Sequence, residues 1–406
     1  MTPLILGVFG LVYLGMALGR APRLEIDRTG FAVLGALVLY VGGAIDGAAI
    51  IHAIDFPTLF VLFALMVLSA QFGVSGFYDW CASRLSRGTV SPPLLLAILI
   101  AVAGGLSAVL ANDVVVFAMT PMLCRGLSAR GLAPQPFLIG LAGAANAGSA
   151  ATIIGNPQNI LIGQAGGLDF WPFAAACAPA AIGGLLSVWI VVRIVWRHHL
   201  TAPSPRPGAE PQPLDRPGLA KAIVATAALV LLFSTPLPHV TSALIVAGGL
   251  LISRRWSTRD IFAPVDWPLL VLFAALFVVT AALSSTGILD SGRLALAAHG
   301  ITLTSLPVLA TIALIGSNTI GNVPAVILIL AATADLPASV LYALAVLSTL
   351  AGNLLLTGSL ANIIMVERAR QVGVTLTFRE HALCGVPIAI LSFAMALPWL
   401  RFIGAQ

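Results

Sequence analysis

Long apolar runs with almost no charge dominate this chain, and they limit what it can fold into. Of its 406 residues, 59% are hydrophobic and only 9% are charged, whereas a soluble domain carries about 25% charged residues. No soluble core could bury so much apolar surface, and the ~10-residue alternating segments of a membrane β-barrel are absent from the sequence. The sequence therefore predicts an all-α polytopic membrane protein.

The apolar runs occur in the same order twice, on either side of a polar, proline-rich segment. In each half we expect five spans and one further apolar region with polar residues at its centre. The expected spans are 2–19, 29–45, 57–76, 134–164 and 168–192, then 219–234, 239–253, 268–286, 337–366 and 382–400. The proline-rich segment indicates a flexible linker, so we expect a first unit at 1–197, a linker at 198–218 and a second unit at 219–406.

The two halves also match in their residues. Three pairs carry the match: IDFP at 54–57 with VDWP at 265–268, Asn112 with Asn322, and GNPQN at 155–159 with GSLAN at 358–362. An internal repeat of this size indicates a duplicated membrane unit. Asp55 and Asp266 precede Pro57 and Pro268, and we interpret them as helix N-caps.

The basic residues indicate whether the central regions, 93–124 and 301–333, cross the membrane or turn back. If both turn back, all but two of the 20 Lys and Arg residues, Arg293 and Arg401, fall on one side. If both cross, the 20 divide almost evenly. The positive-inside rule favours two re-entrant hairpins, with both termini outside and the linker cytoplasmic. The arm 114–124 would supply only about 16 Å of helix, roughly half of the ~30 Å hydrocarbon core.

Five spans per unit is an odd number, so the second unit is expected to be inverted relative to the first. The predicted fold is two inverted repeats, each with five transmembrane helices and one re-entrant hairpin, and with discontinuous helices at mid-membrane. Inverted repeats with broken helices are typical of secondary transporters.

Four breaks are expected near mid-membrane, at 111–113, 154–158, 316–323 and 356–359. Non-helical backbone at that depth is tolerated where it lines a cavity or is buried in protein. A new helix begins after each break, with Asn322 as an N-cap before Pro324 and Ser359 in a similar place after Gly358. Four N-termini at one point would bind an anion without Lys or Arg, and Lys221, near the start of the span 219–234, is the only Lys or Arg within a predicted span.

Asp113 is the only acidic residue with long apolar runs on both sides. An ionisable group at bilayer depth is costly, and this makes Asp113 a functional candidate. Its alternative role is that of a helix cap. The matching position in the second half is Val323, so the halves differ in charge there, and we assign ion coupling to the first half.

These motifs resemble the ion-transporter superfamily, which includes arsenite permeases, divalent anion–sodium symporters and citrate transporters. NAGSAATIIGNPQNI at 146–160 is most similar to the bacterial anion-permease branch near the arsenite permeases. The resemblance covers nearly the whole chain. It implies a scaffold domain and a transport domain, each drawn from both repeats, elevator-like movement and a homodimer in the bacterial inner membrane.

The resemblance also implies which residues form the site. The expected substrate-binding residues are Asn112, Asp113, Asn146, Gly155, Asn156, Asn159, Asn322, Thr357, Gly358, Ser359 and Asn362. The expected coupling-ion residues are Asp113, Asn112, Ser149 and Thr152. Helix–helix hydrogen bonding is an alternative role for the asparagines, including Asn353, and back-bonding to a helix carbonyl is one for Ser149 and Thr152. The dicarboxylate symporters carry Ser-Asn-Thr at both hairpin tips, and this chain has Ala111-Asn112-Asp113 and Gly321-Asn322-Val323 instead.

The leading hypothesis is a secondary transporter of a small inorganic or organic anion, or of a neutral oxyacid such as arsenite, coupled to H⁺ or Na⁺. A Na⁺/H⁺ antiporter is the alternative. An intramembrane enzyme would need a buried acid–base pair or nucleophilic dyad, and the predicted spans offer one carboxylate and no His or Lys at depth. The four Cys have no metal-ligand spacing. We expect no cofactor, no metal other than Na⁺ and no nucleic acid; the expected partners are the substrate and membrane lipid.

Overall fold

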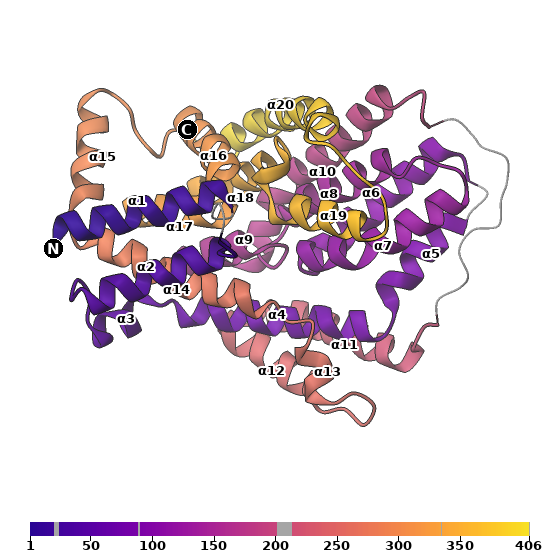
Figure 1. The fold of residues 1–406 in the computed structure, drawn as a ribbon, viewed down its shortest axis with the longest axis horizontal. Helices are drawn as coiled ribbons and strands as arrows, with labels where there is room; N and C mark the ends of the chain where they lie inside the picture. Colours follow the sequence, from indigo (N-terminus) through magenta and orange to yellow (C-terminus); the bar gives the residue numbers. More distant parts are fainter. Residues whose placement is uncertain (20–23, 88–89, 201–212, 334, 406) are drawn as a thin grey trace.

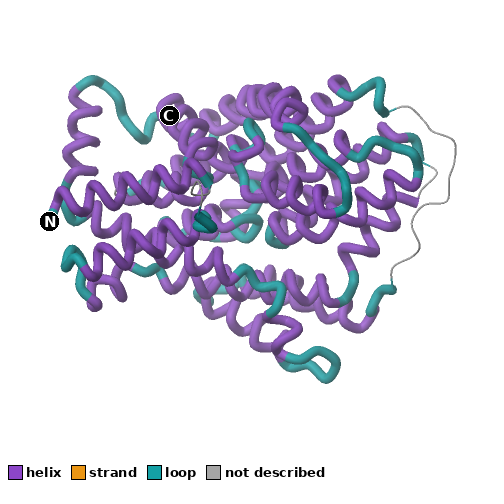
Figure 2. Tube along the Cα trace, in the orientation of Figure 1, coloured by secondary structure: helices purple, strands orange, loops and turns teal. Residues whose placement is uncertain are grey.

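The computed structural model describes residues 1–19, 24–87, 90–200, 213–333 and 335–405. These residues form α-helices joined by loops, with no strand among them (Figures 1 and 2). The prediction of an all-helical chain is therefore confirmed. Most of the predicted linker lies outside the described residues.

Ten helices lie in the described residues of the first half of the chain. They are α1 (Thr2–Leu18), α2 (Arg28–Val41), α3 (Gly47–Ala53), α4 (Phe56–Val74), α5 (Phe77–Arg87), α6 (Pro92–Val109), α7 (Asn112–Ala129), α8 (Gln135–Ser149), α9 (Pro157–Ala165) and α10 (Phe170–Val195). Local sequence explains several starts. Asp27, Asp46 and Asp55 each accept a backbone N–H of the first turn and so cap α2, α3 and α4.

The second half repeats this order. It contains α11 (Arg216–Leu232), α12 (His239–Leu251), α13 (Thr258–Phe262), α14 (Trp267–Ser284), α15 (Ile288–Ala298), α16 (Leu306–Thr319), α17 (Asn322–Ala332), α18 (Ala338–Ala351), the 3₁₀ turn η1 (Leu356–Gly358), α19 (Leu360–Gln371) and α20 (Phe378–Phe402). Asp266 accepts the Leu269 N–H at 3.0 Å and caps α14. The interpretation of Asp55 and Asp266 as N-caps is confirmed.

By length and composition, 5 of the described helices could each cross a membrane alone, namely α4, α6, α10, α14 and α20. Other predicted spans are shorter apolar helices, such as α1, α2 and α12. The fourth predicted span of each half is two separate helices, α8–α9 and α18–α19. Helix α6 is long enough to cross a membrane although the sequence predicts it as one arm of a hairpin. Length alone therefore does not distinguish hairpin arms from spans.

Equivalent helices of the two halves make equivalent contacts across the molecule. Helix α4 packs against α11 and α12, and α14 packs against α1 and α2. Likewise α7 packs against α19, and α17 packs against α9. Figure 1 shows α5 and α7 toward one end of the molecule and α15 and α17 toward the other. The two halves are therefore interleaved around the region where the helices break.

The second arm of the first hairpin, α7, is longer than the sequence predicted. Helix α7 has 18 residues and continues through Pro121 to Ala129, about 27 Å at 1.5 Å per residue. The expected end at Cys124 was wrong because Arg125 through Ala129 stay helical beyond the apolar run. The equivalent helix α17 has 11 residues and ends at Ala332.

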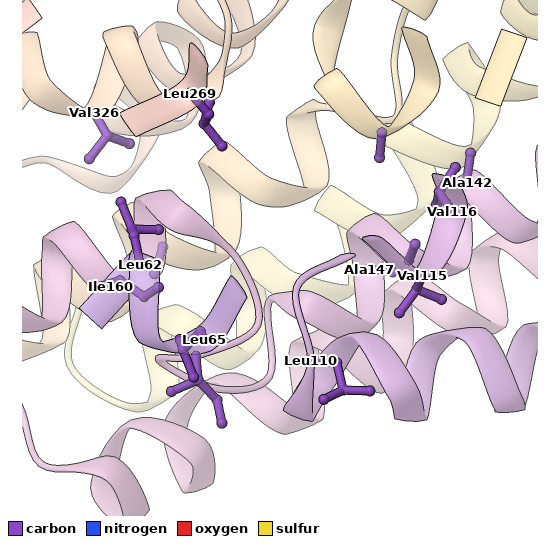
Figure 3. Packing of buried hydrophobic residues seen from close by; sticks show 14 of the residues in the cluster. Leu62, Leu65, Leu110, Val115, Val116, Ala142, Ala147, Ile160, Leu269 and Val326 are labelled. Carbon is purple, nitrogen blue, oxygen red and sulfur yellow. The ribbon is translucent and has the colours of Figure 1, made fainter. Parts of the chain in front are cut away.

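Small side chains allow the helices around the breaks to approach closely. A Cβ on Gly148 in α8 would overlap the carbonyl of Gly104 in α6, so these two backbones touch. Figure 3 shows Val115 and Val116 of α7 beside Ala142 and Ala147 of α8. Close packing of small residues is the usual means of helix association where there is no hydrophobic driving force between helices. This close packing of α6 and α7 on α8 holds the hairpin tip against the broken helix.

Candidate functional site

Each hairpin turns in two residues before its second helix begins. The residues Leu110 and Ala111 separate α6 from α7, and Ile320 and Gly321 separate α16 from α17. Gly321 is the N-cap of α17, with φ +100°, a conformation that side-chain-bearing residues rarely adopt. The prediction that Asn322 is the N-cap was therefore wrong, because Gly321 makes the turn and Asn322 is the first helical residue.

Asn112 and Asn322 occupy the two hairpin tips, and each has an unsatisfied side-chain oxygen. Asn112 is 5% exposed and its Nδ2 donates to Asn146 Oδ1 at 3.3 Å. The Oδ1 atoms of Asn112 and Asn322 are both buried without a hydrogen-bond partner among the described residues. Buried polar atoms almost always have a partner, and of the buried side-chain atoms without one in the described chain, these two occupy equivalent positions of the two halves, so we treat them as candidate ligand contacts.

The two broken helices are capped and joined to one another reciprocally. Asn156 caps α9 and its Nδ2 donates to Thr349 Oγ1 in α18 at 3.2 Å. Ser359 caps α19 and its Oγ donates to Asn146 Oδ1 in α8 at 2.8 Å. Each cap therefore binds the helix that precedes the other break. These bonds fix the two helix starts relative to each other.

Asn159 and Asn362 lie behind the breaks and bind the carbonyls that the breaks leave free. Asn159 Nδ2 donates to Ser149 O and Thr152 O at 3.1 and 2.9 Å. Asn362 Nδ2 donates to Gly352 O and Leu355 O at 2.8 and 3.1 Å. Both side chains are 0% exposed. They satisfy orphan carbonyls at the ends of α8 and α18, and neither lines either of the two cavities described below.

Asn146 connects the first hairpin to both broken helices. It is 1% exposed, accepts from Asn112 and Ser359, and donates to Asn353 Oδ1 and Asn362 Oδ1 at 2.9 and 3.1 Å. Its position predicts a structural role between the tip and the breaks, because all four contacts are with protein atoms.

The remaining expected residues separate into three groups. Gly155 and Gly358 allow close approach: the Gly155 carbonyl accepts from Asn112 N at 3.3 Å, and a Cβ on Gly358 would overlap Asn318 Oδ1. Ser149 and Thr152 bond to neighbouring backbone, at Asn146 O and Ala108 O. Thr357 is exposed and lines neither cavity described below.

The starts of four helices line one small cavity of about 90 Å³. They contribute Asn112 and Asp113 (α7), Pro157 and Gln158 (α9), Asn322 and Val323 (α17), and Ser359 and Leu360 (α19). Helix N-termini carry partial positive charge and free N–H groups. The cavity thus has the electrostatics of an anion site, with the two unsatisfied Asn residues in its lining.

Asp113 also lines a second cavity of about 290 Å³ between α4, α7, α9 and the start of α14. Leu62, Leu65, Ile160 and Leu269 contribute apolar wall there, and Figure 3 shows them close to one another. No side chain caps α7, so the alternative role of Asp113 as its N-cap is wrong; Ala111 holds that position. The carboxylate is left available to both cavities.

Sequence reasoning missed two charged residues of these cavities and one buried histidine. Arg28 lines the small cavity and Asp266 the large one, although Arg28 was assigned to a loop and Asp266 only to a cap. His381 is 3% exposed, with Nδ1 unpartnered among the described residues. The expectation of no His at depth was wrong because α20 begins at Phe378, before the predicted span. A signal for Arg28 was its place directly after a capping Asp, at the first helical residue.

Within the described residues, no three His, Cys, Asp or Glu side chains come together as a metal site. The features that remain are an apolar helical fold, interrupted helices meeting end to end, and a cavity at their N-termini. This combination defines a multi-span membrane protein of the secondary-transporter class. The chain belongs to the CitMHS citrate transporter family, whose profile matches residues 12–339.

Individual relatives agree with this assignment. The silicon efflux transporter LSI3 of Oryza sativa subsp. japonica is 27% identical, over 96% of each chain. The inner membrane protein YbiR of Escherichia coli is 30% identical, over 79% of this chain and 81% of that protein. The crystal structure of the YdaH transporter of Alcanivorax borkumensis aligns over 99% of this chain and 97% of its own, with TM-score 0.56 and 15% identity, which shows the fold alone.

The family assignment confirms the predicted superfamily and confirms that the chain is a transporter and not an enzyme. It also confirms a multi-pass membrane protein with a small-molecule substrate.

Proposed function

We propose that this protein moves a small anion or a neutral oxyacid across the bacterial inner membrane, coupled to H⁺ or Na⁺. The observation that carries the proposal is the small cavity. Four helix N-termini line it, together with Asn112 and Asn322, whose buried Oδ1 atoms have no partner among the residues that the structure describes. N–H groups suit the oxygen atoms of an anion, whereas the two Oδ1 atoms suit hydroxyl donors or a cation.

Asp113 is the proposed coupling group. It lines both cavities, and a carboxylate beside a bound anion is unfavourable unless it is protonated or paired with a cation. Binding of H⁺ or Na⁺ at Asp113 would therefore accompany binding of the substrate, or alternate with it. The names of relatives are consistent with either kind of substrate, because one is a silicon efflux transporter and the family is described as citrate transporters.

The proposed movement is alternating access of the elevator type. The reciprocal contacts of α4 with α11 and α12, and of α14 with α1 and α2, support inverted repeats and a scaffold drawn from both. The hairpins, the broken helices, α10 and α20 would form the moving part. Opposite placement of α7 and α17 in Figure 1 supports two hairpins that enter from opposite sides. We propose external termini, the 198–218 linker in the cytoplasm and a homodimer, as the sequence predicts.

Transport by purified protein in liposomes tests the proposal. Uptake of arsenite, phosphate, sulfate, dicarboxylates and citrate would be measured with an imposed H⁺ gradient, an imposed Na⁺ gradient, or neither. We expect gradient-driven accumulation of at least one of them. Asp113→Asn should abolish the response to the gradient, whereas Asp290→Asn, at an exposed position of α15, should not.

Gradient-driven flux that is unchanged in Asp113→Asn would refute the coupling role. A Na⁺-driven change of internal pH with no anion present would instead favour the antiporter. Single-channel currents would refute alternating access.

A further inference from the structure

Arg28 is a basic residue in the lining of the small cavity, at a place where sequence reasoning expected none. It is the first residue of α2, half-buried, and it reaches the hairpin tip of the other half of the chain. Its Nη1 lies 3.9 Å from where a Cβ of Gly321 would stand. The guanidinium therefore lies beside the N-terminus of α17.

The charge of Arg28 has no protein partner among the described residues. Its neighbour Asp27 faces its own helix, because the Asp27 carboxylate accepts the Gly30 N–H at 2.9 Å and caps α2. Asp113 lines the same cavity, yet the two side chains form no ion pair. Both side chains are therefore available to a ligand in that cavity.

The position of Arg28 is electrostatically unfavourable when the cavity is empty. Cations are favoured near helix C-termini, but this guanidinium lies at the start of its own helix and beside the start of α17. Three further helix N-termini line the same space. An anion in the cavity would compensate all of these charges. Local arrangements that oppose stability are expected at functional sites.

The lining of the cavity also offers hydrogen-bond acceptors. Asn112 and Asn322 line the cavity with Asp113, and their Oδ1 atoms have no hydrogen-bond partner in the part of the chain that the structure describes. A ligand that satisfies both the donors and the acceptors needs negatively charged oxygen for the guanidinium and N–H groups, and hydroxyl hydrogens for the Asn and Asp oxygens. A fully deprotonated oxyanion lacks those hydrogens and would leave the buried acceptors unsatisfied, which costs about 1–3 kcal/mol per group.

We propose that Arg28 binds the substrate directly and that the small cavity selects a small oxyanion that still carries hydroxyl groups. This inference rests on the proposed transport function and narrows its substrate class. Arg28 supplies the charge requirement, and Asn112 and Asn322 supply the hydroxyl requirement. Dihydrogen phosphate and dihydrogen arsenate, each with two hydroxyl groups and a negative charge, have the required chemistry, whereas sulfate lacks the hydroxyl and arsenous acid lacks the charge.

Ligand titration of the purified full chain tests this proposal, with phosphate, sulfate and arsenous acid at neutral pH as probes. The expected order for the wild type is phosphate above sulfate. Arg28→Gln should weaken phosphate binding about tenfold to a hundredfold, the range expected for a hydrogen bond to a charged group. Arg28→Lys keeps the charge and should retain most of the affinity. Arg254→Gln, at an exposed loop position, is the matched control and should bind as the wild type does.

Asn322→Ala supplies an independent readout. Removing one acceptor should reduce the preference for phosphate over sulfate, even if Arg28→Gln folds poorly. Wild-type binding of sulfate equal to that of phosphate, or equal phosphate affinity in wild type and Arg28→Gln, would overturn the proposal. Binding of arsenous acid alone, unaffected by Arg28→Gln, would overturn it and leave the proposed transport function intact. If no probe bound and no anion were accumulated by proteoliposomes, the proposed function would fail as well.

Discussion

Replacement of Gly358 by alanine should lower the stability of the protein at the break before α19. The added methyl group would displace Asn318, whose side chain holds the backbone of the break by hydrogen bonds. Gly358 lies in η1 with no positive φ, so alanine is compatible with the backbone. The obstacle is steric. The added Cβ would overlap Asn318 Oδ1 and would lie 3.1 Å from Gly352 O.

Asn318 cannot move away cheaply, because it is held by three hydrogen bonds. Its Nδ2 donates to Leu314 O and Ala351 O, both at 2.9 Å, and its Oδ1 accepts from Leu355 N at 3.1 Å. Displacing the side chain leaves Leu355 N–H and Ala351 O without these partners. Ala351 O still accepts the Leu354 N–H at 3.1 Å, so Leu355 N–H is the backbone group left unpaired, and the expected loss is about 1–3 kcal/mol. Ser359, the N-cap of α19, comes directly after Gly358 in the chain, so the cavity that it lines should be distorted too.

Thermal unfolding and transport would be measured on the same preparations. The matched control is Gly292→Ala in α15, where a Cβ meets nothing within 4 Å, and it should be neutral or slightly stabilising. Asn318→Ala should also be destabilising, but adding Gly358→Ala to it should cost little more, since the overlapping atom is gone. Equal stability of Gly358→Ala and Gly292→Ala, or strict additivity in the double variant, would refute the reasoning.

Three further predictions concern the polar network. Thr349→Val should lower the free energy of unfolding by about 1–3 kcal/mol, because Thr349 Oγ1 accepts from Asn156 and Gln158. Thr311→Val, at an exposed position, is the control, and equal unfolding temperatures of the two variants would contradict the expectation. Asn146→Ala should lower both stability and transport, since it removes bonds to Asn112, Asn353, Asn362 and Ser359; a stable variant with normal flux would count against a structural role. Gly148→Ala should separate α6 from α8, because its Cβ meets backbone at Gly104, whereas Gly105→Ala, with nothing within 4 Å, should leave the unfolding temperature near that of the wild type.

The sequence by itself determined the class of fold and the places where helices break. Apolar runs with few charges require membrane helices, and the paired GNPQN and GSLAN segments predicted the interruptions before α9 and α19. Caps at Asp55, Asp266 and Ser359 also followed from local chemistry, because a cap depends on residues within one turn. Asn112 and Asn322 were predicted at hairpin tips from the repeat, and both line the small cavity.

Only the tertiary structure decided which polar side chains line the cavity and which form hydrogen bonds to backbone carbonyls. Asn159 and Asn362 have the same residue type as Asn112 and Asn322, but their amides bind carbonyls freed by their own breaks. Arg28 and Asp266 come from helix starts distant in sequence from the hairpin tips, and they reach the cavities because α2 and α14 pack there. Composition and periodicity record how apolar a segment is, whereas the partner of a buried polar atom depends on long-range packing, which a local pattern does not encode.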